Sequence, residues 1–185
     1  YKLKYNIPID SEVVIFSGRL IKQKNVDLII NSLIGLKKVF LFIIGDGEEK
    51  IRLSDLARQK GIDFAITGFI EEQEELFKMY YAGDILILPS YDESWGLVVN
   101  EAMAAGLPVI VSNECGCSLD LVRDGENGYI LTDLENSETL RNLIMKALKN
   151  KESFSKKSLE IIDNWTFENS RKSFEELLKL LNNFK

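Results

Sequence analysis

Six short apolar runs constrain the fold of this 185-residue chain more than any other feature of its sequence. The runs are rich in Val, Ile and Leu, and a glycine or a polar residue follows each of them within two positions. This pattern is typical of strands that are buried on both faces of a parallel sheet. We expect strands at residues 13–16, 39–44, 64–67, 85–88, 109–111 and 129–131.

Apolar residues recur at helical spacing between most of these runs and after the last one. We expect helices at residues 26–36, 51–60, 96–105, 139–148, 152–164 and 167–184, and another that ends at Tyr81. Strands that alternate with helices through short connections predict an α/β fold, a Rossmann-like three-layer α/β/α domain with a six-stranded parallel sheet. Ligands of such sheets bind beyond the carboxyl ends of the strands, so the turns after the strands are the candidate site.

The composition argues against several classes of protein. A net charge of -6 and a pI of about 4.9 argue against nucleic-acid binding through a basic face. The sequence has no histidine, so proton transfer near neutral pH needs a carboxylate, a lysine, a tyrosine, the ligand itself or another polypeptide. Cys115 and Cys117 are poorly spaced for a disulfide and too few for a zinc site, so we expect an incidental or structural role. We expect no metal and no cofactor.

The chain contains no run of the roughly 20 apolar residues that a membrane helix needs, and its first residues do not resemble a signal peptide. Because we expect no disulfide between the two cysteines, we expect a cytoplasmic location. Residues 1–11 are polar and lack an initial methionine. We expect them to be a lead-in from a preceding domain.

The stretch PSYDESWGLVVNEAMAAGLPVIVS, residues 89–112, is the strongest candidate for a binding site. It predicts a loop, a short helix and a buried strand. A loop that leads directly into a helix presents free N–H groups and a positive dipole end to an anion, above all a phosphate. Glu93 precedes the helix start, and Glu101 lies roughly 7 Å beyond Gly96 along the helix axis. One ligand could therefore hold its phosphate in the middle and its hydroxyl groups at both carboxylates.

Three other features leave alternatives open. Arg19 and Lys24, in the turn after the first strand, could clamp a pyrophosphate or could simply be solvated. The turn GDGEEK at residues 45–50 lacks the third glycine of a dinucleotide fingerprint and is better explained as the floor of a pocket. Trp95 and Tyr91 could be pocket walls or packing residues.

These residues together resemble the nucleotide-sugar-binding half of a two-domain GT-B glycosyltransferase, of the retaining family called family four or group one. The most specific element is the pair of glutamates separated by seven residues in ESWGLVVNE. FSGRLIKQKNVDLII, IIGDGEE, ITGF and DLVRDGENGYIL also match, in the order expected, and the resemblance covers residues 13–148.

The resemblance implies a role for each part of the site. Arg19 and Lys24 would hold the donor pyrophosphate, and together with Glu93 they are the catalytic candidates. Glu93 would contact the hydroxyl groups of the transferred sugar, and Glu101 those of the ribose. Phe69 and Ile70 would border the base. The full set of expected substrate-binding residues is Gly18, Arg19, Lys24, Gly45, Phe69, Ile70, Glu93, Ser94, Trp95, Gly96, Leu97, Val98 and Glu101.

The resemblance also implies an activity and a division of the chain. Residues 12–165 would form the donor-binding domain, and residues 166–185 a helix that crosses back to an amino-terminal domain. The expected reaction moves a hexose-type sugar from a UDP or GDP donor to a glycan or lipid-linked acceptor, with peripheral membrane association of the full enzyme. Without the other half, which carries the acceptor site and commonly a catalytic histidine, this chain should bind donor and transfer little.

Two alternatives belong to other classes: a GT-B-fold sugar-nucleotide epimerase, and a non-catalytic nucleotide-binding module. An epimerase would convert its sugar nucleotide with no acceptor present. One departure from the family pattern follows the fifth strand, where CGCSLD replaces the usual glycine pair and glutamate. We interpret CGCSLD as the mark of a subgroup.

Overall fold

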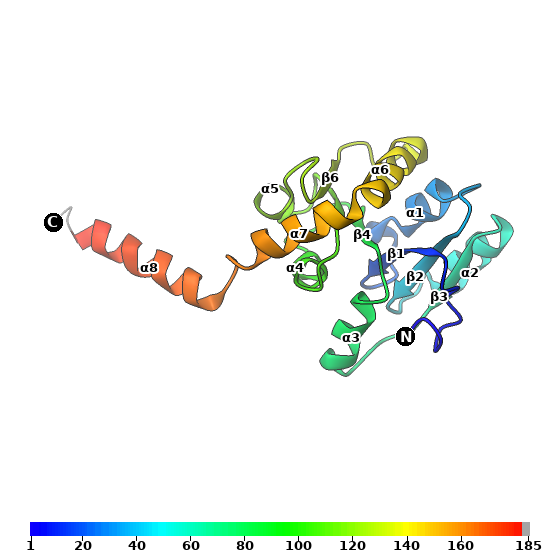
Figure 1. Ribbon diagram of the computed structural model, residues 1–185, viewed down its shortest axis with the longest axis horizontal. Helices are drawn as coiled ribbons and strands as arrows, with labels where there is room; N and C mark the ends of the chain where they lie inside the picture. The colour runs from blue at the N-terminus through cyan, green and yellow to red at the C-terminus, as the bar shows by residue number, and fades with distance from the viewer. Residues whose placement is uncertain (183–185) are drawn as a thin grey trace.

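A computed structural model describes residues 1–182 and contains one six-stranded sheet in the order β3-β2-β1-β4-β5-β6, with every neighbouring pair parallel (Figure 1). The six-stranded parallel sheet expected from the sequence is therefore confirmed. Its strands are β1 (Glu12–Ser17), β2 (Val39–Ile44), β3 (Asp63–Ile66), β4 (Ile85–Leu88), β5 (Val109–Ser112) and β6 (Gly128–Leu131).

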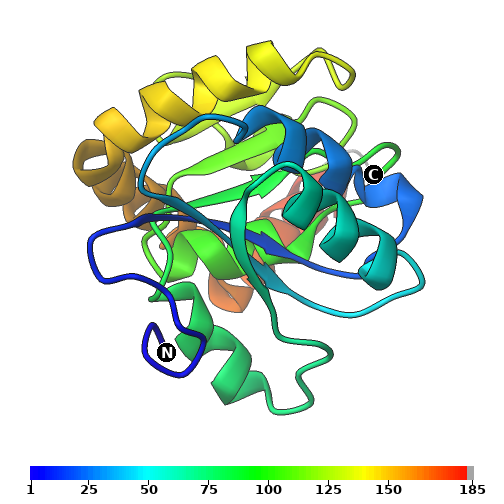
Figure 2. The same cartoon turned by 90° about the vertical axis from the view of Figure 1, so that its right-hand side faces the viewer.

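The helices cover both faces of the sheet and complete the Rossmann-like three-layer arrangement (Figure 2). Helices α1, α2 and α6 pack beside one another on one face, and α3, α4 and α7 on the other. Their bounds are α1 (Val26–Ser32), α2 (Lys50–Gln59), α3 (Gln73–Tyr80), α4 (Leu97–Ala104), α6 (Ser137–Lys149) and α7 (Lys151–Ile162).

The core lies between these layers and explains why the strands are continuous apolar runs. Every residue of β4 and β5 is buried, and Val13 and Ile15 of β1 have no exposed surface. At the amino-terminal edge of the sheet, Lys151 bridges Glu12 and Asp84, at 2.6 and 2.8 Å. The opposite edge carries the glycine-rich turns and is free to form a site.

Two short helices were not expected from the sequence. They are η1 (Lys22–Lys24) and α5 (Ser118–Leu121), and both are too short to show a helical period. The first expected helix also ends early, at Ser32, because the chain turns through Gly35 with φ +78°.

Residues 1–11 pack on the sheet domain. Ile7 is buried, and the Tyr5 ring lies 5.0 Å from the ring of Phe42, centroid to centroid. The lead-in is thus part of the same folded body.

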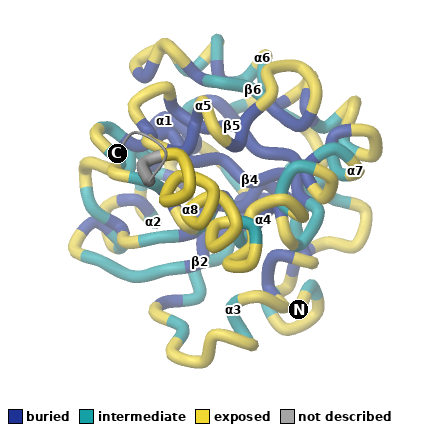
Figure 3. The backbone as a smooth tube through the Cα atoms, turned by 90° about the vertical axis from the view of Figure 1, so that its left-hand side faces the viewer, coloured by how far each residue is buried: buried dark blue, intermediate teal, exposed yellow. Residues whose placement is uncertain are grey.

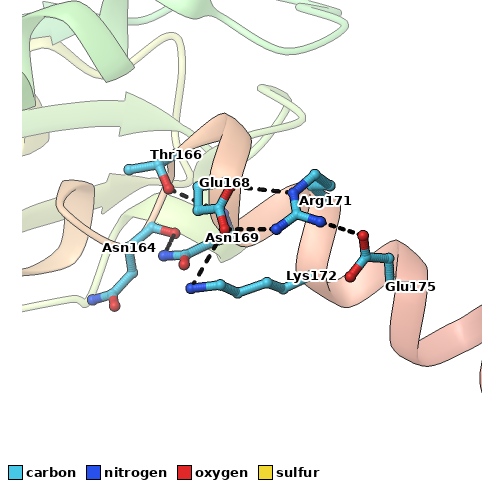
Figure 4. A network of polar contacts seen from close by, with 7 residues as sticks. All are labelled: Asn164, Thr166, Glu168, Asn169, Arg171, Lys172 and Glu175. Atoms are coloured by element: carbon cyan, nitrogen blue, oxygen red, sulfur yellow. Dashed lines mark hydrogen bonds and ion pairs between the residues drawn. The ribbon is translucent and has the colours of Figure 1, made fainter.

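Helix α8 (Phe167–Asn182) extends away from the sheet domain (Figure 1). Its residues 167–180 are exposed, apart from the half-buried Asn169 (Figure 3). Thr166 caps its start by accepting a hydrogen bond from the Asn169 N–H, at 3.1 Å. Arg171 joins Glu168 and Glu175 through ion pairs on the polar side of α8 (Figure 4). The expected helix end at residues 183–184 and the side chain of Leu181 lie outside what the structure describes.

Candidate functional site

A cavity of about 240 Å³ opens at the carboxyl edge of the sheet, between the turns that follow β1, β2 and β3 and the helix α4. Seven of the residues predicted for the site line it. They are Gly18, Arg19, Gly45, Phe69, Ile70, Val98 and Glu101. The remaining lining residues are Ser17, Ile44, Asp46 and Leu76. Turns from three strands, distant in sequence, therefore meet around one ligand-sized space.

The start of α4 has the geometry of an anion site. Gly96 precedes the helix in the left-handed region at φ +93°, and no side chain within residues 1–182 caps the helix start. A Cβ at Gly96 would lie 2.9 Å from Leu88 Cδ2, so the position favours glycine for both conformation and space. The first N–H groups of α4 are consequently left for water or a ligand.

Lys24 and Glu93 form an ion pair beside this helix start. Lys24 belongs to η1 and Glu93 to the loop after β4, and their side chains are only 19% and 18% exposed. The two loops are also joined by the Gln23 side chain, which donates to the Asp92 carbonyl at 3.0 Å. Six predicted site residues lie outside the cavity and form a ledge that adjoins it. They are Lys24, Glu93, Ser94, Trp95, Gly96 and Leu97.

The backbone around Glu93 is fixed by the segment after β5. The Glu93 N–H donates to the Glu114 carbonyl at 3.1 Å, the Gly116 N–H to the Glu93 carbonyl at 2.8 Å, and the Cys117 N–H to the Trp95 carbonyl at 3.1 Å. A Cβ at Gly116 would lie 2.1 Å from the Ser94 carbonyl oxygen. The motif CGCSLD, which sequence reasoning treated only as a subgroup mark, therefore holds the Glu93 loop in place, and its glycine was the available signal.

Both cysteines of this segment are buried in the core. Burial raises the pKa of Cys115 to about 12 and that of Cys117 to about 11, so both remain neutral thiols at physiological pH. Their placement fits a packing role.

Glu101 is held from behind by a buried hydroxyl group. The Tyr80 hydroxyl lies 2.8 Å from Glu101 Oε2 and 3.0 Å from Ser17 Oγ. Burial raises the pKa of Glu101, and the hydrogen bond from Tyr80 opposes that rise. Tyr80 was not among the predicted site residues, because a tyrosine in an amphipathic helix carries no signal of what its hydroxyl contacts.

The two aromatic residues left open by the sequence pack against other parts of the fold. The Trp95 ring lies 5.5 Å from that of Trp165, and its indole N–H donates to Asn100 Oδ1 at 2.9 Å. The Tyr91 hydroxyl donates to the Leu134 carbonyl at 3.2 Å. Phe69, in contrast, is 79% exposed at the rim of the cavity.

Residues 1–182 lack two further features. No group of three or more His, Cys, Asp or Glu side chains could hold a metal ion. No helix in this range is long and apolar enough to cross a membrane.

Comparison with known proteins identifies glycosyltransferases that are similar to this chain. The lipopolysaccharide 1,2-N-acetylglucosaminetransferase of Salmonella typhimurium is 29% identical over an alignment 191 residues long. The alignment covers 94% of this chain and 50% of that protein. The chain thus spans about half the length of that curated relative.

Two solved structures share the fold. One is the C-terminal domain of a glycosyl transferase group 1 family protein (LpcC) from Francisella tularensis, with a TM-score of 0.75, 24% identity and coverage of 86% of this chain and 87% of that one. The other is Anabaena Alr3699/HepE in complex with UDP, with a TM-score of 0.80, 22% identity and coverage of 96% and 51%.

The sequence profile of the family "Glycosyl transferases group 1" matches residues 1–165. This match covers most of the chain, and the solved relatives have the same α/β architecture. The chain belongs to the glycosyl transferases group 1 family, whose structural neighbours are glycosyltransferases of the GT-B fold.

Proposed function

We propose that this chain is the donor-binding domain of a retaining glycosyltransferase that moves a hexose-type sugar from a UDP or GDP donor to a glycan or lipid-linked acceptor. The observation that carries the proposal is the uncapped start of α4, with the Glu93 carboxylate on the ledge before it and the Glu101 carboxylate in the cavity beside it. The start of α4 would bind the phosphates, Glu93 the sugar hydroxyls and Glu101 the ribose hydroxyls.

The two compartments of the site suggest how the donor lies. The nucleoside would occupy the cavity, with its ribose on Glu101 and its base against Phe69 and Ile70. Its diphosphate would sit at the start of α4, between Arg19 and Lys24. The sugar would lie over the ledge, with its hydroxyl groups on Glu93.

Catalysis in this arrangement is mainly electrostatic. Cleavage of the bond between sugar and phosphate leaves negative charge on the nucleoside diphosphate. Arg19, Lys24 and the helix start would stabilise that charge as it develops, at fixed positions. The leaving phosphate would accept the acceptor's proton on the same face of the sugar, which retains the anomeric configuration and requires no histidine from this chain.

Transfer would need a second polypeptide segment to supply the acceptor site. Helix α8 fits a role in holding it, since Phe174, Leu177 and Leu178 are 61%, 50% and 45% exposed, on a helix whose polar side is already paired. We propose that α8 crosses to that segment, that this chain alone binds donor and transfers little, and that the full enzyme works in the cytoplasm at the inner face of the membrane.

Titration calorimetry of this chain with UDP, GDP and ADP tests the proposal. We expect UDP or GDP to bind and Lys24→Met to weaken that binding. Failure of all three nucleotides to bind at millimolar concentration would contradict the proposed function. In a complete enzyme, Glu93→Ala should strongly reduce transfer, and conversion of the donor without an acceptor would instead indicate an epimerase.

A further inference from the structure

The hydroxyl group of Tyr80 is placed to act on the site without touching a ligand. Tyr80 is the last residue of α3 and has no exposed surface. It does not line the cavity, although Ser17 and Glu101, the two residues that its hydroxyl contacts, both do. Tyr80 therefore lies directly behind the wall of the nucleoside compartment.

The direction of the hydrogen bonds follows from the chemistry of the three groups. An ionised carboxylate only accepts hydrogen bonds, and a tyrosine hydroxyl has one proton to donate. The Tyr80 proton therefore goes to Glu101 Oε2, at 2.8 Å, and the Ser17 hydroxyl donates to the Tyr80 oxygen, at 3.0 Å. Such a chain of hydrogen bonds, Ser17 to Tyr80 to Glu101, strengthens each member.

This series of hydrogen bonds fixes one carboxylate oxygen of Glu101 and leaves the other available to a ligand. Among the described residues, Tyr80 is the only side chain that hydrogen-bonds the Glu101 carboxylate. A glutamate side chain has several rotatable bonds and would otherwise sample many positions. With Oε2 held from behind, Oε1 and the remaining lone pairs can face the cavity in one orientation, as a pair of neighbouring ligand hydroxyls requires.

We propose that Tyr80 is a positioning residue that orients Glu101 toward the 2′ and 3′ hydroxyl groups of the donor ribose and so sets the preference for ribonucleotides. This inference rests on the proposed function, because it takes Glu101 as the ribose ligand. Tyr80 acts only through Glu101, whereas a tyrosine that merely fills the core would affect all ligands of the site alike.

The test compares UDP and GDP with their 2′,3′-dideoxy forms by calorimetry, using the chain itself. Hydrogen bonds to a charged group correspond to roughly tenfold or more in affinity, so the wild-type protein should prefer the ribonucleotide by about that factor. Tyr80→Phe should lower this preference at least threefold and leave the affinity for the dideoxy form unchanged. Tyr81→Phe removes a hydroxyl from a neighbouring residue that is 72% exposed and should change nothing.

A second variant covers the case in which Tyr80→Phe does not fold. Ser17→Ala removes the hydroxyl that donates to Tyr80 and should lower the ribonucleotide preference by a smaller factor. The inference is overturned if Tyr80→Phe keeps the full preference, if it weakens both forms of the nucleotide equally, or if only Tyr81→Phe reduces the preference. Where Tyr80→Phe does not fold, an unchanged preference in Ser17→Ala overturns it. If the wild-type protein binds no nucleotide, the proposed function fails instead, and the inference falls with it.

Discussion

The Lys24–Glu93 ion pair predicts that one substitution will have different effects on two related ligands. In the structure, the Glu93 carboxylate pairs with the Lys24 ammonium group, which the donor diphosphate would also need. Glu93→Gln keeps the size of the side chain and removes its charge. We expect this variant to bind free UDP or GDP more tightly than the wild-type protein, and to gain no affinity for the sugar nucleotide.

The magnitude follows from the geometry of two anions that share one ammonium group. With both oxygens about 3 Å from Lys24 Nζ, a phosphate lies about 5 Å from the Glu93 carboxylate. Coulomb's law at an effective dielectric constant of about 20 then gives a repulsion of about 3 kcal/mol for each pair of unit charges. Because the ledge is partly open to water and ions, we expect about half of this value, or roughly a tenfold gain in affinity for UDP.

The sugar nucleotide should gain no affinity, because Glu93 would bind the hydroxyl groups of the sugar. Losing a hydrogen bond to a charged group costs about 1.5–3 kcal/mol, which cancels or exceeds the electrostatic gain. Calorimetry with UDP and with a UDP-hexose measures both affinities. Glu48→Gln is the matched control, since it removes an exposed carboxylate that does not pair with Lys24. Equal changes for the two ligands, or weaker binding of UDP, would show that Glu93 and the diphosphate do not share Lys24.

Three further predictions concern stability. Burial raises the pKa of Glu101, so the folded chain holds a proton there more tightly than the unfolded chain. The contribution of Glu101 to stability therefore falls as the pH rises through that pKa. Glu101→Gln should raise the melting temperature more at pH 7 than at pH 4. Gly116→Ala would force a Cβ to within 2.1 Å of the Ser94 carbonyl oxygen and should cost about 2 kcal/mol or more, a fall of roughly 4–8 °C in thermal unfolding, with loss of nucleotide binding. Phe174→Ser changes a side chain that is 61% exposed on α8 and should leave the melting temperature within about 2 °C of wild type; a large fall would mean that α8 packs on the domain.

The sequence predicted all six strands, because a strand buried on both faces is a continuous apolar run bounded by turns. It also predicted that the turns after β1, β2 and β3 would meet at one edge, since parallel strands share a direction. The short elements η1 and α5 were missed because three or four residues carry no period. Their positions depend on contacts with distant loops.

The partners of the site residues were less predictable than the residues themselves. Glu93 was identified from its place before a helix, but its pairing with Lys24 depends on two loops 69 residues apart in sequence. The hydroxyl of Tyr80 and the backbone contacts of Gly116 arise only when α3 and the segment after β5 fold against α4 and its loop. Local patterns contain no record of such contacts.

The proposed site of the nucleoside diphosphate is the start of α4, and amide chemical shifts can locate the ligand there. Titration of ¹⁵N-labelled protein with UDP and GDP should shift the backbone amide resonances of Gly96, Leu97 and Val98 most strongly, because their N–H groups would donate hydrogen bonds to the phosphate. Smaller shifts should appear at Ile70 and Glu101. Saturable binding that leaves the amides of residues 96–98 unchanged and shifts another surface would show that the diphosphate does not bind at the start of α4.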